Sequence, residues 1–415
     1  MYIDKITLTN IRGFKHLDFS LARPDGSYAG WTVFTGDNGG GKSTLLKASV
    51  MALVGLGVAG QLSSSLFKSW MRHETKHGDI SLVTVKAEED IPSRENIAFD
   101  PDLKNCFLGF TPLGVFGNQA IPEKKLLGYF VCAYGPYRRV FGSSAEMSRL
   151  MADKTTAPFV TLFQESASLA EVDQWMRLLS HKKLEGKKAE EKQLDILLGI
   201  LGDDLLPNGI TIDRVDSDGL WLKDKNGLQL SWGDMSDGYR SALALLADIL
   251  RHMIEAYGVE DLTGVDADGK LFIKRSGVVL IDEIDAHLHP SWQRDIGFWL
   301  KKHFPAIQFL VTTHSPIICQ AADPNGIFVL PSPASDDEPR AMTEAEYNEI
   351  VASKSDAILL TPAFGLVNTR SNLAVTNRSE WSRLRIKERA GAALTEAEKA
   401  RFEALTNFVN ADAAS

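Results

Sequence analysis

The sequence predicts an α/β protein built on a mainly parallel core sheet, and three stretches carry that prediction. Residues 31–35 form a short strand that leads into a glycine-rich loop and a helix. Residues 278–281 form a continuous apolar run that ends in two acids, and residues 308–313 form another that ends at His314. Runs without polar alternation are typical of strands buried on both faces of a parallel sheet. Since ligands bind at the carboxyl ends of such strands, we expect a site there.

The composition is that of a soluble globular protein. The 415 residues are 44% hydrophobic and 24% charged, with a net charge of −9, so a large core and two or three domains are expected. We find no apolar run near the roughly 20 residues of a membrane span and no signal peptide, which predicts a cytoplasmic protein without a membrane partner. The acidic balance argues against a generally DNA-coating surface but leaves a local basic stripe open. Three separated cysteines in apolar contexts indicate buried free thiols: Cys106, Cys132 and Cys319.

The loop after the first of these strands predicts a nucleoside triphosphate site. Residues 36–44 read Gly-Asp-Asn-Gly-Gly-Gly-Lys-Ser-Thr, which matches G-x-x-x-x-G-K-S between a strand and a helix, as that motif requires. Glycines let backbone N–H groups curl around phosphate oxygens, and the helix N-terminus adds partial positive charge. We expect Lys42 to reach the β- and γ-phosphates and the Ser43 hydroxyl to bind Mg²⁺. The predicted nucleotide-binding residues are Asn38, Gly39, Gly40, Gly41, Lys42, Ser43 and Thr44.

The acidic pair after residues 278–281 suits the metal and the attacking water. Asp282 can hold Mg²⁺, which prefers hard oxygen ligands and keeps several waters. Glu283 can then polarise a water. Such pairs also end strands merely as turn formers, but here the pair accompanies a phosphate loop. The expected cofactors are therefore ATP and Mg²⁺.

The motifs follow one another in an order that resembles the ABC-type ATPases of the SMC, RecF and OLD-like group. Residues 8–14, Leu-Thr-Asn-Ile-Arg-Gly-Phe, precede the phosphate loop as in that group, and Ser236-Asp-Gly238 stands at a helix start like its signature. Residues 282–290, Asp-Glu-Ile-Asp-Ala-His-Leu-His-Pro, and 312–316, Thr-Thr-His-Ser-Pro, complete the order. The resemblance implies an ATPase head with an antiparallel lobe and the mainly parallel core sheet.

The same resemblance implies roles for individual residues. Lys42, Glu283 and His314 would be catalytic, with His314 sensing the γ-phosphate, and Asp285 would belong to the D-loop. Arg12 would contact phosphate or adenine, although a solvent-exposed turn residue is the simpler interpretation. The signature would grip the γ-phosphate held by another subunit through Ser236, Asp237 and Gly238.

The chain also departs from the family pattern. A strand over residues 127–133 should lead into the Q-loop, but the nearest glutamines, Gln119 and Gln164, do not stand at an obvious strand end. Arg138 and Arg139 follow that strand and could face phosphate, DNA or a carboxylate. Helical periodicity over 166–201 lacks the sustained heptads of a long coiled coil, so we expect a short hairpin whose lysine-rich tip is solvated rather than bound to DNA.

We expect four segments: a first ATPase lobe with the phosphate loop, a helical insertion, a second lobe with the remaining motifs, and a mixed C-terminal tail that offers a docking region. In the tail we expect a loop over 323–339 and a helix over 387–409, while the apolar piece 358–365 could dock a partner or pack on the head. The predicted boundaries are 1–165, 166–205, 206–330 and 331–415.

The resemblance extends to ATPase subunits of anti-phage systems such as Septu, PARIS and some retrons. It implies a homodimer or higher homo-oligomer with ATP sandwiched between heads, controlling a separate effector, an HNH or Toprim nuclease. Two other functions stay open: a static ATP-bound sensor scaffold, and a RecF-like DNA-repair clamp, so nucleic acid remains a candidate ligand. The tail has no histidine after His314, and its acids lie in a predicted loop and helix. We therefore predict that the chain alone does not cut nucleic acid.

Overall fold

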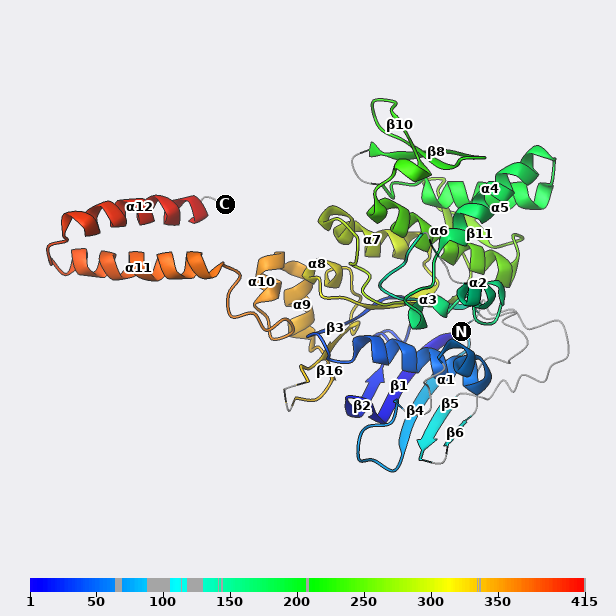
Figure 1. The fold of residues 1–415 in the computed structure, drawn as a ribbon, viewed down its shortest axis with the longest axis horizontal. Helices are drawn as coiled ribbons and strands as arrows, with labels where there is room; N and C mark the ends of the chain where they lie inside the picture. The colour runs from blue at the N-terminus through cyan, green and yellow to red at the C-terminus, as the bar shows by residue number, and fades with distance from the viewer. Residues whose placement is uncertain are drawn as a thin grey trace. The chain divides into compact units, whose positions relative to one another are not determined.

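The computed structural model describes the chain as two compact units, Met1–Ser355 and Asp356–Ser415 (Figure 1). We expected a separate tail from residue 331, whereas the structure places 331–355 in the first unit. The description covers the whole chain except residues 64–68, 88–104, 113, 118–129, 141, 143–144, 207–208, 334, 336 and 414–415.

The first unit contains the predicted parallel core sheet. Its six strands lie in the order β16-β15-β3-β14-β13-β7, and all neighbours are parallel except the edge pair β15–β16. Every residue of β13 and β14 is buried, which explains why their sequences show no polar alternation. The strand bounds are β3 Gly30–Gly36, β7 Val131–Tyr134, β13 Gly277–Ile281, β14 Ile307–Thr312, β15 Ile327–Leu330 and β16 Arg340–Ala341.

The loop expected over 323–339 is wrong for its central part. Residues 327–330, Ile-Phe-Val-Leu, form β15, which pairs in parallel with β3 next to the phosphate loop. Three of these four side chains are buried. The surrounding Pro, Ser and Asp residues favour a loop, but an apolar run of four residues is long enough for a strand once a sheet edge is available to cover it.

A second, antiparallel sheet forms the other layer of the ATPase head, in the order β2-β1-β4-β5-β6. Helix α1, Lys42–Leu62, lies on this sheet against β4 and β5 (Figure 1). Of the helices in the described ranges, α1 alone is long and apolar enough to cross a membrane, but 72% of its most apolar window is buried inside the protein. The strands are β1 Tyr2–Ile11, β2 Phe14–Ser20, β4 Gly78–Val85, β5 Asn105–Thr111 and β6 Gly114–Gly117.

The predicted helical hairpin is present as α4, Ala170–Leu184, and α5, Lys188–Leu201. Its lysine-rich tip is laced by ion pairs, including Lys182–Glu190 at 3.0 Å and Lys183–Asp195 at 2.9 Å. The tip is therefore a charged, solvated turn as expected. The remaining elements of this unit are α2 Ala145–Ala152, α3 Val160–Phe163, β8 Thr211–Asp216, β9 Gly219–Lys223, β10 Gln229–Ser231, α6 Asp237–Tyr257, β11 Thr263–Val265, β12 Leu271–Ile273, α7 Pro290–His303, α8 Pro316–Cys319 and α9 Glu344–Ala352.

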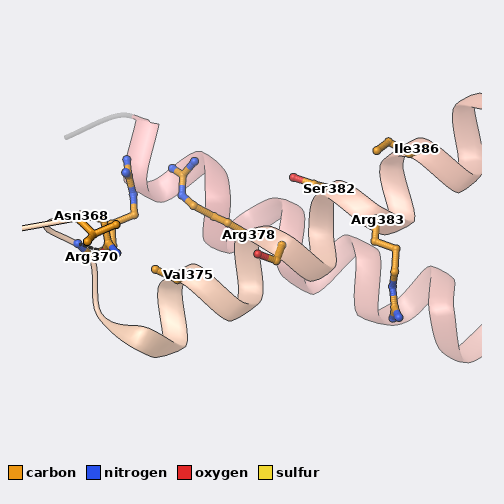
Figure 2. A pocket seen from close by; sticks show the side chains of 9 residues that line it. Asn368, Arg370, Val375, Arg378, Ser382, Arg383 and Ile386 are labelled. Atoms are coloured by element: carbon orange, nitrogen blue, oxygen red, sulfur yellow. Dashed lines mark hydrogen bonds between the residues drawn. The ribbon is translucent and has the colours of Figure 1, made fainter.

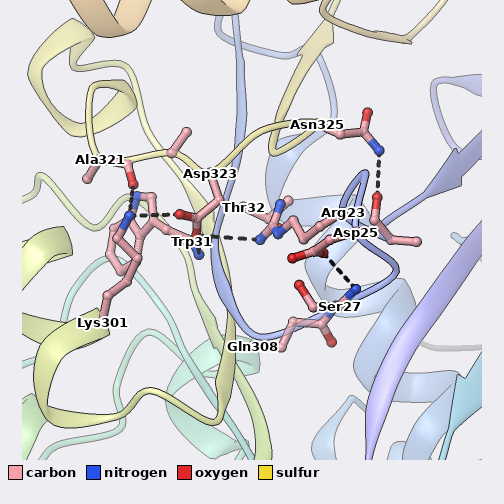
Figure 3. Close-up of polar contacts among 12 residues, drawn as sticks. Arg23, Asp25, Ser27, Trp31, Thr32, Lys301, Gln308, Ala321, Asp323 and Asn325 are labelled. Atoms are coloured by element: carbon pink, nitrogen blue, oxygen red, sulfur yellow. Dashed lines mark hydrogen bonds and ion pairs between the residues drawn. The ribbon is translucent and has the colours of Figure 1, made fainter.

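A polar clasp around Asp323 fixes the amino end of β3, away from the phosphate loop (Figure 3). The Asp323 carboxylate accepts a hydrogen bond from the Trp31 N–H at 2.6 Å and one from the Lys301 ammonium at 2.9 Å. The Arg23 guanidinium, itself buried, donates to the Thr32 hydroxyl at 2.9 Å and lies 3.9 Å from Asp323. The clasp therefore joins β3, α7 and the segment before β15.

The second unit contains an antiparallel helix pair, α11, Asn372–Arg389, and α12, Glu396–Ala413. The helix expected over 387–409 is wrong because the chain turns at Gly391, whose φ of 75° is left-handed. The helices are joined by a hydrogen bond from the Trp381 indole to the Thr406 hydroxyl at 3.0 Å. A short helix, α10 Ser355–Leu359, precedes them.

Candidate functional site

The phosphate loop connects the carboxyl end of β3 to α1. Gly39 and Gly41 have φ of 82° and 94°, in the left-handed region that favours glycine. A Cβ on Gly41 would lie 2.4 Å from the Phe14 ring, so this position also lacks room for a side chain. The exposed Asn38 and Gly39 lead the loop, and Ser43 and Thr44 stand in the first turn of α1. The loop thus presents backbone N–H groups and a helix N-terminus to one side.

The Lys42 side chain folds back onto the phosphate loop and binds its backbone. Its ammonium is buried and donates to the carbonyls of Gly36 at 2.8 Å and Asp37 at 2.9 Å. Burial lowers the pKa of Lys42, while the nearby charges of Asp282 and Glu283 act in the opposite direction. The charges of Asp37 and Asp285 also act on it. The structure therefore brings the lysine and the acidic strand end together, as predicted.

The two acids at the end of β13 are held by one threonine. The Thr312 hydroxyl, on neighbouring β14, donates to an Asp282 carboxylate oxygen at 2.6 Å and accepts the Glu283 N–H at 2.7 Å. Asp282 is buried, while Glu283 is half-buried and has a left-handed φ of 46°. The next residue, Thr313, donates its hydroxyl to Asp285 at 2.5 Å. Thr312, at the end of β14, and Thr313, just after it, therefore hold the carboxylates of Asp282 and Asp285 and the backbone N–H of Glu283.

His314 follows these threonines and is half-buried. Burial lowers its pKa, and the positive charge of Lys42 lowers it further, whereas Asp285 and Glu283 oppose this change. A lowered pKa keeps the imidazole neutral at pH 7, so that one ring nitrogen can accept and the other can donate a hydrogen bond. The histidine therefore belongs to the same charged cluster as Lys42.

Arg12 lies beside the first turn of α1. Its guanidinium stacks on the Trp70 ring at 4.2 Å from the ring centroid, and one nitrogen lies 3.5 Å from the Thr44 hydroxyl. Another nitrogen donates to the Ser69 carbonyl at 3.4 Å. Arg12 is thus an exposed residue of the turn between β1 and β2, and this turn lies next to the phosphate loop.

The signature stands apart from this cluster, at the start of α6. Ser236 is the N-cap residue and is exposed, and Asp237 pairs with Arg240 of its own helix. A Cβ on Gly238 would lie 2.5 Å from the His287 carbonyl, so the glycine permits close packing against the turn that follows Glu283. The signature therefore contacts the acidic turn from its far side and leaves Ser236 open to solvent.

Sequence reasoning did not assign the contacts that hold these parts. The structure places Arg138 at the acidic turn, where its guanidinium donates to the backbone carbonyl of Glu283 at 2.8 Å, a partner that is none of its three predicted neighbours. Gln164 donates to the Leu62 carbonyl at the end of α1, whereas Gln119 lies outside the described residues. The only sequence signal for these contacts was the position of Arg138 after a strand of the core sheet.

A buried ionic cluster also joins α6 to β7. The Tyr134 hydroxyl donates to Asp248 at 3.0 Å, and Asp248 lies 2.7 Å from Arg251 and 3.3 Å from His252. Burial alone would raise the pKa of Asp248, but Arg251 and His252 hold it well below its usual range. None of these residues belongs to a motif, and only their spacing on α6 hinted at a shared face.

Comparisons with known proteins agree with this geometry. A family model described as "AAA domain, putative AbiEii toxin, Type IV TA system" matches residues 156–320, and an "AAA domain" model matches residues 5–100. Septu protein PtuA of Bacillus mycoides is 26% identical over 90% of this chain and 46% of its own length. The Retron Ec83 probable ATPase of Escherichia coli is 44% identical over 26% of this chain and 18% of its own. The chain thus spans less than half of either relative.

Solved structures similar to this chain include an SMC head bound to the C-winged helix domain of ScpA, with a TM-score of 0.46 and 16% identity over 82% of this chain and 98% of that one. RecF-ATPrS in the RecFOR pathway gives a TM-score of 0.44 and 14% identity over the same shares. The strand that leads into the phosphate loop and the acidic strand lie in one sheet, with β14 between them. The chain therefore carries matches to AAA-domain family models over residues 5–100 and 156–320, and it is similar in sequence to Septu protein PtuA and to retron ATPases.

Proposed function

We propose that this chain binds ATP with Mg²⁺ and hydrolyses it at the cluster formed by the phosphate loop and the end of β13. The observation that supports this most is the position of Lys42. Its ammonium lies in the phosphate loop, and the negative charges of Asp282, Glu283 and Asp285 act to raise its pKa. A buried cation at a helix N-terminus, facing carboxylates, suits a phosphate group whose metal ion balances the remaining charge.

The donors at this place fit a magnesium ion. The Asp282 carboxylate and the Ser43 hydroxyl are hard oxygen ligands of the kind that Mg²⁺ takes beside phosphate oxygens and water. When bound, the ion would neutralise charge that develops on the phosphates. Lys42 would exchange the carbonyls of Gly36 and Asp37 for β- and γ-phosphate oxygens. Glu283 would orient the attacking water, and His314 would contact the γ-phosphate.

Replacing Lys42 tests the site. Lys42→Ala removes the cation that faces the phosphates, so we expect nucleotide binding and turnover to be lost, measured with labelled ATP and by phosphate release. Lys187→Ala, at the exposed hairpin tip, is the matched control and should behave as the wild type. Wild-type hydrolysis by Lys42→Ala would overturn the assignment.

The proposed active form is an ATP-bound pair of heads. Ser236 and Asp237 are exposed at the start of α6, and Asp237 pairs with Arg240 rather than with the loop. A signature open to solvent can supply its N–H groups and helix dipole to a γ-phosphate in another subunit. ATP would then favour the closed pair, and hydrolysis would release it.

We also propose that the ATPase controls a separate effector, a nuclease of the HNH or Toprim type, in anti-phage defence. This rests on the relationship to Septu PtuA and the retron ATPases. We place the protein in the cytoplasm, where reducing conditions would keep the three buried free cysteines as thiols.

The second unit offers a surface suited to such an effector. A groove of about 690 Å³ runs along α11, and three arginines line it beside apolar side chains (Figure 2). Val367 is 95% exposed and Ile386 69% exposed, so apolar area is open there. An acidic segment with apolar side chains would complement this groove. The arginines are Arg370, Arg378 and Arg383.

If the effector is separate, the purified chain should not cut nucleic acid. In the tail, Glu346 caps α9 with Thr343 and pairs with Arg340 at 2.6 Å, a structural role rather than a metal-binding one. We expect plasmid, linear DNA and tRNA to stay intact with the protein, ATP and Mg²⁺ or Mn²⁺. Cleavage that follows the protein through purification and persists in Glu283→Gln would contradict the proposal.

A further inference from the structure

The turn that carries Glu283 has an uncommon backbone. Glu283 has a φ of 46° and His287 a φ of 67°, both left-handed although neither is glycine. Residues other than glycine rarely adopt these backbone angles, so such a turn persists only where contacts with neighbouring residues stabilise it. The turn closes on itself through a hydrogen bond from the Ala286 N–H to the Glu283 carbonyl at 2.9 Å. The other contacts that stabilise this turn therefore determine the direction of the Glu283 carboxylate.

Arg138 supplies the largest further contact with this turn. Its guanidinium is buried, and one nitrogen donates to the Glu283 carbonyl at 2.8 Å and to the Ala286 carbonyl at 3.1 Å. The two carbonyls lie at opposite ends of the turn, so a single side chain joins them. Arg138 comes from the segment after β7, and its sequence separation from Glu283 is 145 residues.

The contacts of Glu283 thus fix its backbone on both sides. Its N–H is bound by the Thr312 hydroxyl, and its carbonyl is bound by Arg138. With both flanking peptide groups held, the direction of the Cα–Cβ bond is set, and only side-chain rotation remains. A water-orienting carboxylate needs this, because small displacements of a reacting group lower the rate steeply.

The surroundings keep Arg138 charged. Burial lowers its pKa to about 10, whereas Asp285, Asp282 and Glu283 act to raise it. A guanidinium with that pKa is protonated at neutral pH, so it offers a cation as well as its donors. Charge-assisted hydrogen bonds to carbonyls are stronger than neutral ones.

We infer that Arg138 is a positioning residue for ATP hydrolysis: it holds the turn of residues 283–286 so that Glu283 faces the attacking water. The inference rests on the proposed role of Glu283. It differs from the three roles that the sequence left open for Arg138, contact with a phosphate, with DNA or with a carboxylate, because the guanidinium is committed to backbone carbonyls of the turn.

Turnover and nucleotide affinity, measured separately, test this inference. Arg138→Met keeps the length of the side chain and removes its charge and donors, so we expect kcat to fall about 10- to 100-fold while the Kd for ATP stays within about 3-fold. Arg138→Lys has a smaller, less directional donor and should recover part of kcat. Arg139→Met is the matched control, because that neighbouring arginine is exposed, and it should match the wild type.

A double variant distinguishes positioning from a general effect. If Arg138 acts through Glu283, Arg138→Met in a Glu283→Gln background should lower kcat no further. Multiplied losses, or equal kcat for Arg138→Met and the wild type, would overturn the inference, and a raised Kd with unchanged kcat would make Arg138 a phosphate ligand instead. If Arg138→Met unfolds at the assay temperature, Arg138→Gln replaces it in the same cycle. An inactive wild type would instead contradict the proposed ATPase activity.

Discussion

At the scale of single residues, Thr312 makes two contacts that its place in the Thr-Thr-His-Ser-Pro motif did not predict. Its hydroxyl satisfies an Asp282 oxygen and the Glu283 N–H at once. Both groups are at the buried end of β13, where an unpaired polar atom is costly. Thr312 therefore links stability to catalysis, since the same two bonds orient the candidate metal ligand and the candidate water-orienting acid.

Thr312→Val preserves the shape of the side chain and removes the hydroxyl. We expect the free energy of unfolding to fall by about 1–3 kcal/mol, because the buried Asp282 loses a donor and the Glu283 N–H loses an acceptor. ATP turnover should fall as well. Urea unfolding and phosphate release measure the two effects, and Thr312→Ser, which keeps the hydroxyl, is the control. If valine is tolerated in both assays, the bridge has no role.

At the scale of elements, α6 carries two features on one helix. Its N-terminus presents the signature, and about three turns further on its buried Asp248 pairs with Arg251 and His252 and accepts a hydrogen bond from Tyr134 of β7. The ionic cluster therefore anchors the signature helix to β7, the strand that leads to Arg138. This contact fixes the distance between α6 and β7.

Asp248→Asn should loosen this anchor. Arg251 and His252 would lose their most buried counter-charge and keep only Glu171 at 3.7 Å and Glu255 at 3.4 Å, so we expect the free energy of unfolding to fall by up to about 3–5 kcal/mol. Asp261→Asn is the control, because Asp261 forms exposed ion pairs with Lys274 and Arg275 and should change stability little. Chemical denaturation measures both. Equal unfolding midpoints for the two variants would contradict a structural role for the cluster.

The same cluster predicts how stability depends on pH. Burial lowers the pKa of His252, but Asp248 and Glu255 together raise it more, so its folded pKa lies above its unfolded value of 6.5. The stabilisation from protonated His252 is therefore complete below about pH 6.5 and declines as the pH rises through the raised pKa. His252→Gln should flatten that part of the stability curve, which urea titrations at several pH values would show.

At the scale of the whole molecule, the first unit divides the ATPase parts between two places. The phosphate loop, the acidic strand and His314 share one end of the core sheet, whereas the signature begins α6 and packs against the His287 carbonyl. In the proposed pair of heads, a second subunit would supply the signature that contacts the γ-phosphate. Its activity would then depend on pairing, and defects in the two parts should complement each other.

Mixing two inactive variants tests the pairing. Lys42→Ala lacks a working phosphate loop and Ser236→Arg blocks the signature, so neither should hydrolyse ATP alone. In an equimolar mixture about half of randomly formed dimers pair the two variants, each with one intact site, so up to about a quarter of wild-type turnover should return. Recovery should rise with protein concentration. Complete inactivity at every mixing ratio would argue against sites shared between subunits.

The sequence by itself determined the chemistry-bearing strands. The phosphate loop, the run before Asp282 and the run before His314 are local patterns, because each depends on residues that are neighbours in the chain. The structure places all three strands side by side as expected. The helical hairpin with its charged tip and the buried free cysteines were also predicted correctly.

Only the tertiary structure decided what holds these parts in place. Tyr134 and Asp248 are 114 residues apart, and Arg138 and Glu283 are 145 apart, so no local pattern could pair them. The same reason explains why β15 was not predicted. Its four apolar residues lie within a polar segment, and they form a strand because they pair with the edge of β3, which is distant in the sequence. Local sequence specifies which groups can do the chemistry, and long-range packing specifies where they point, because that depends on partners brought together only by folding.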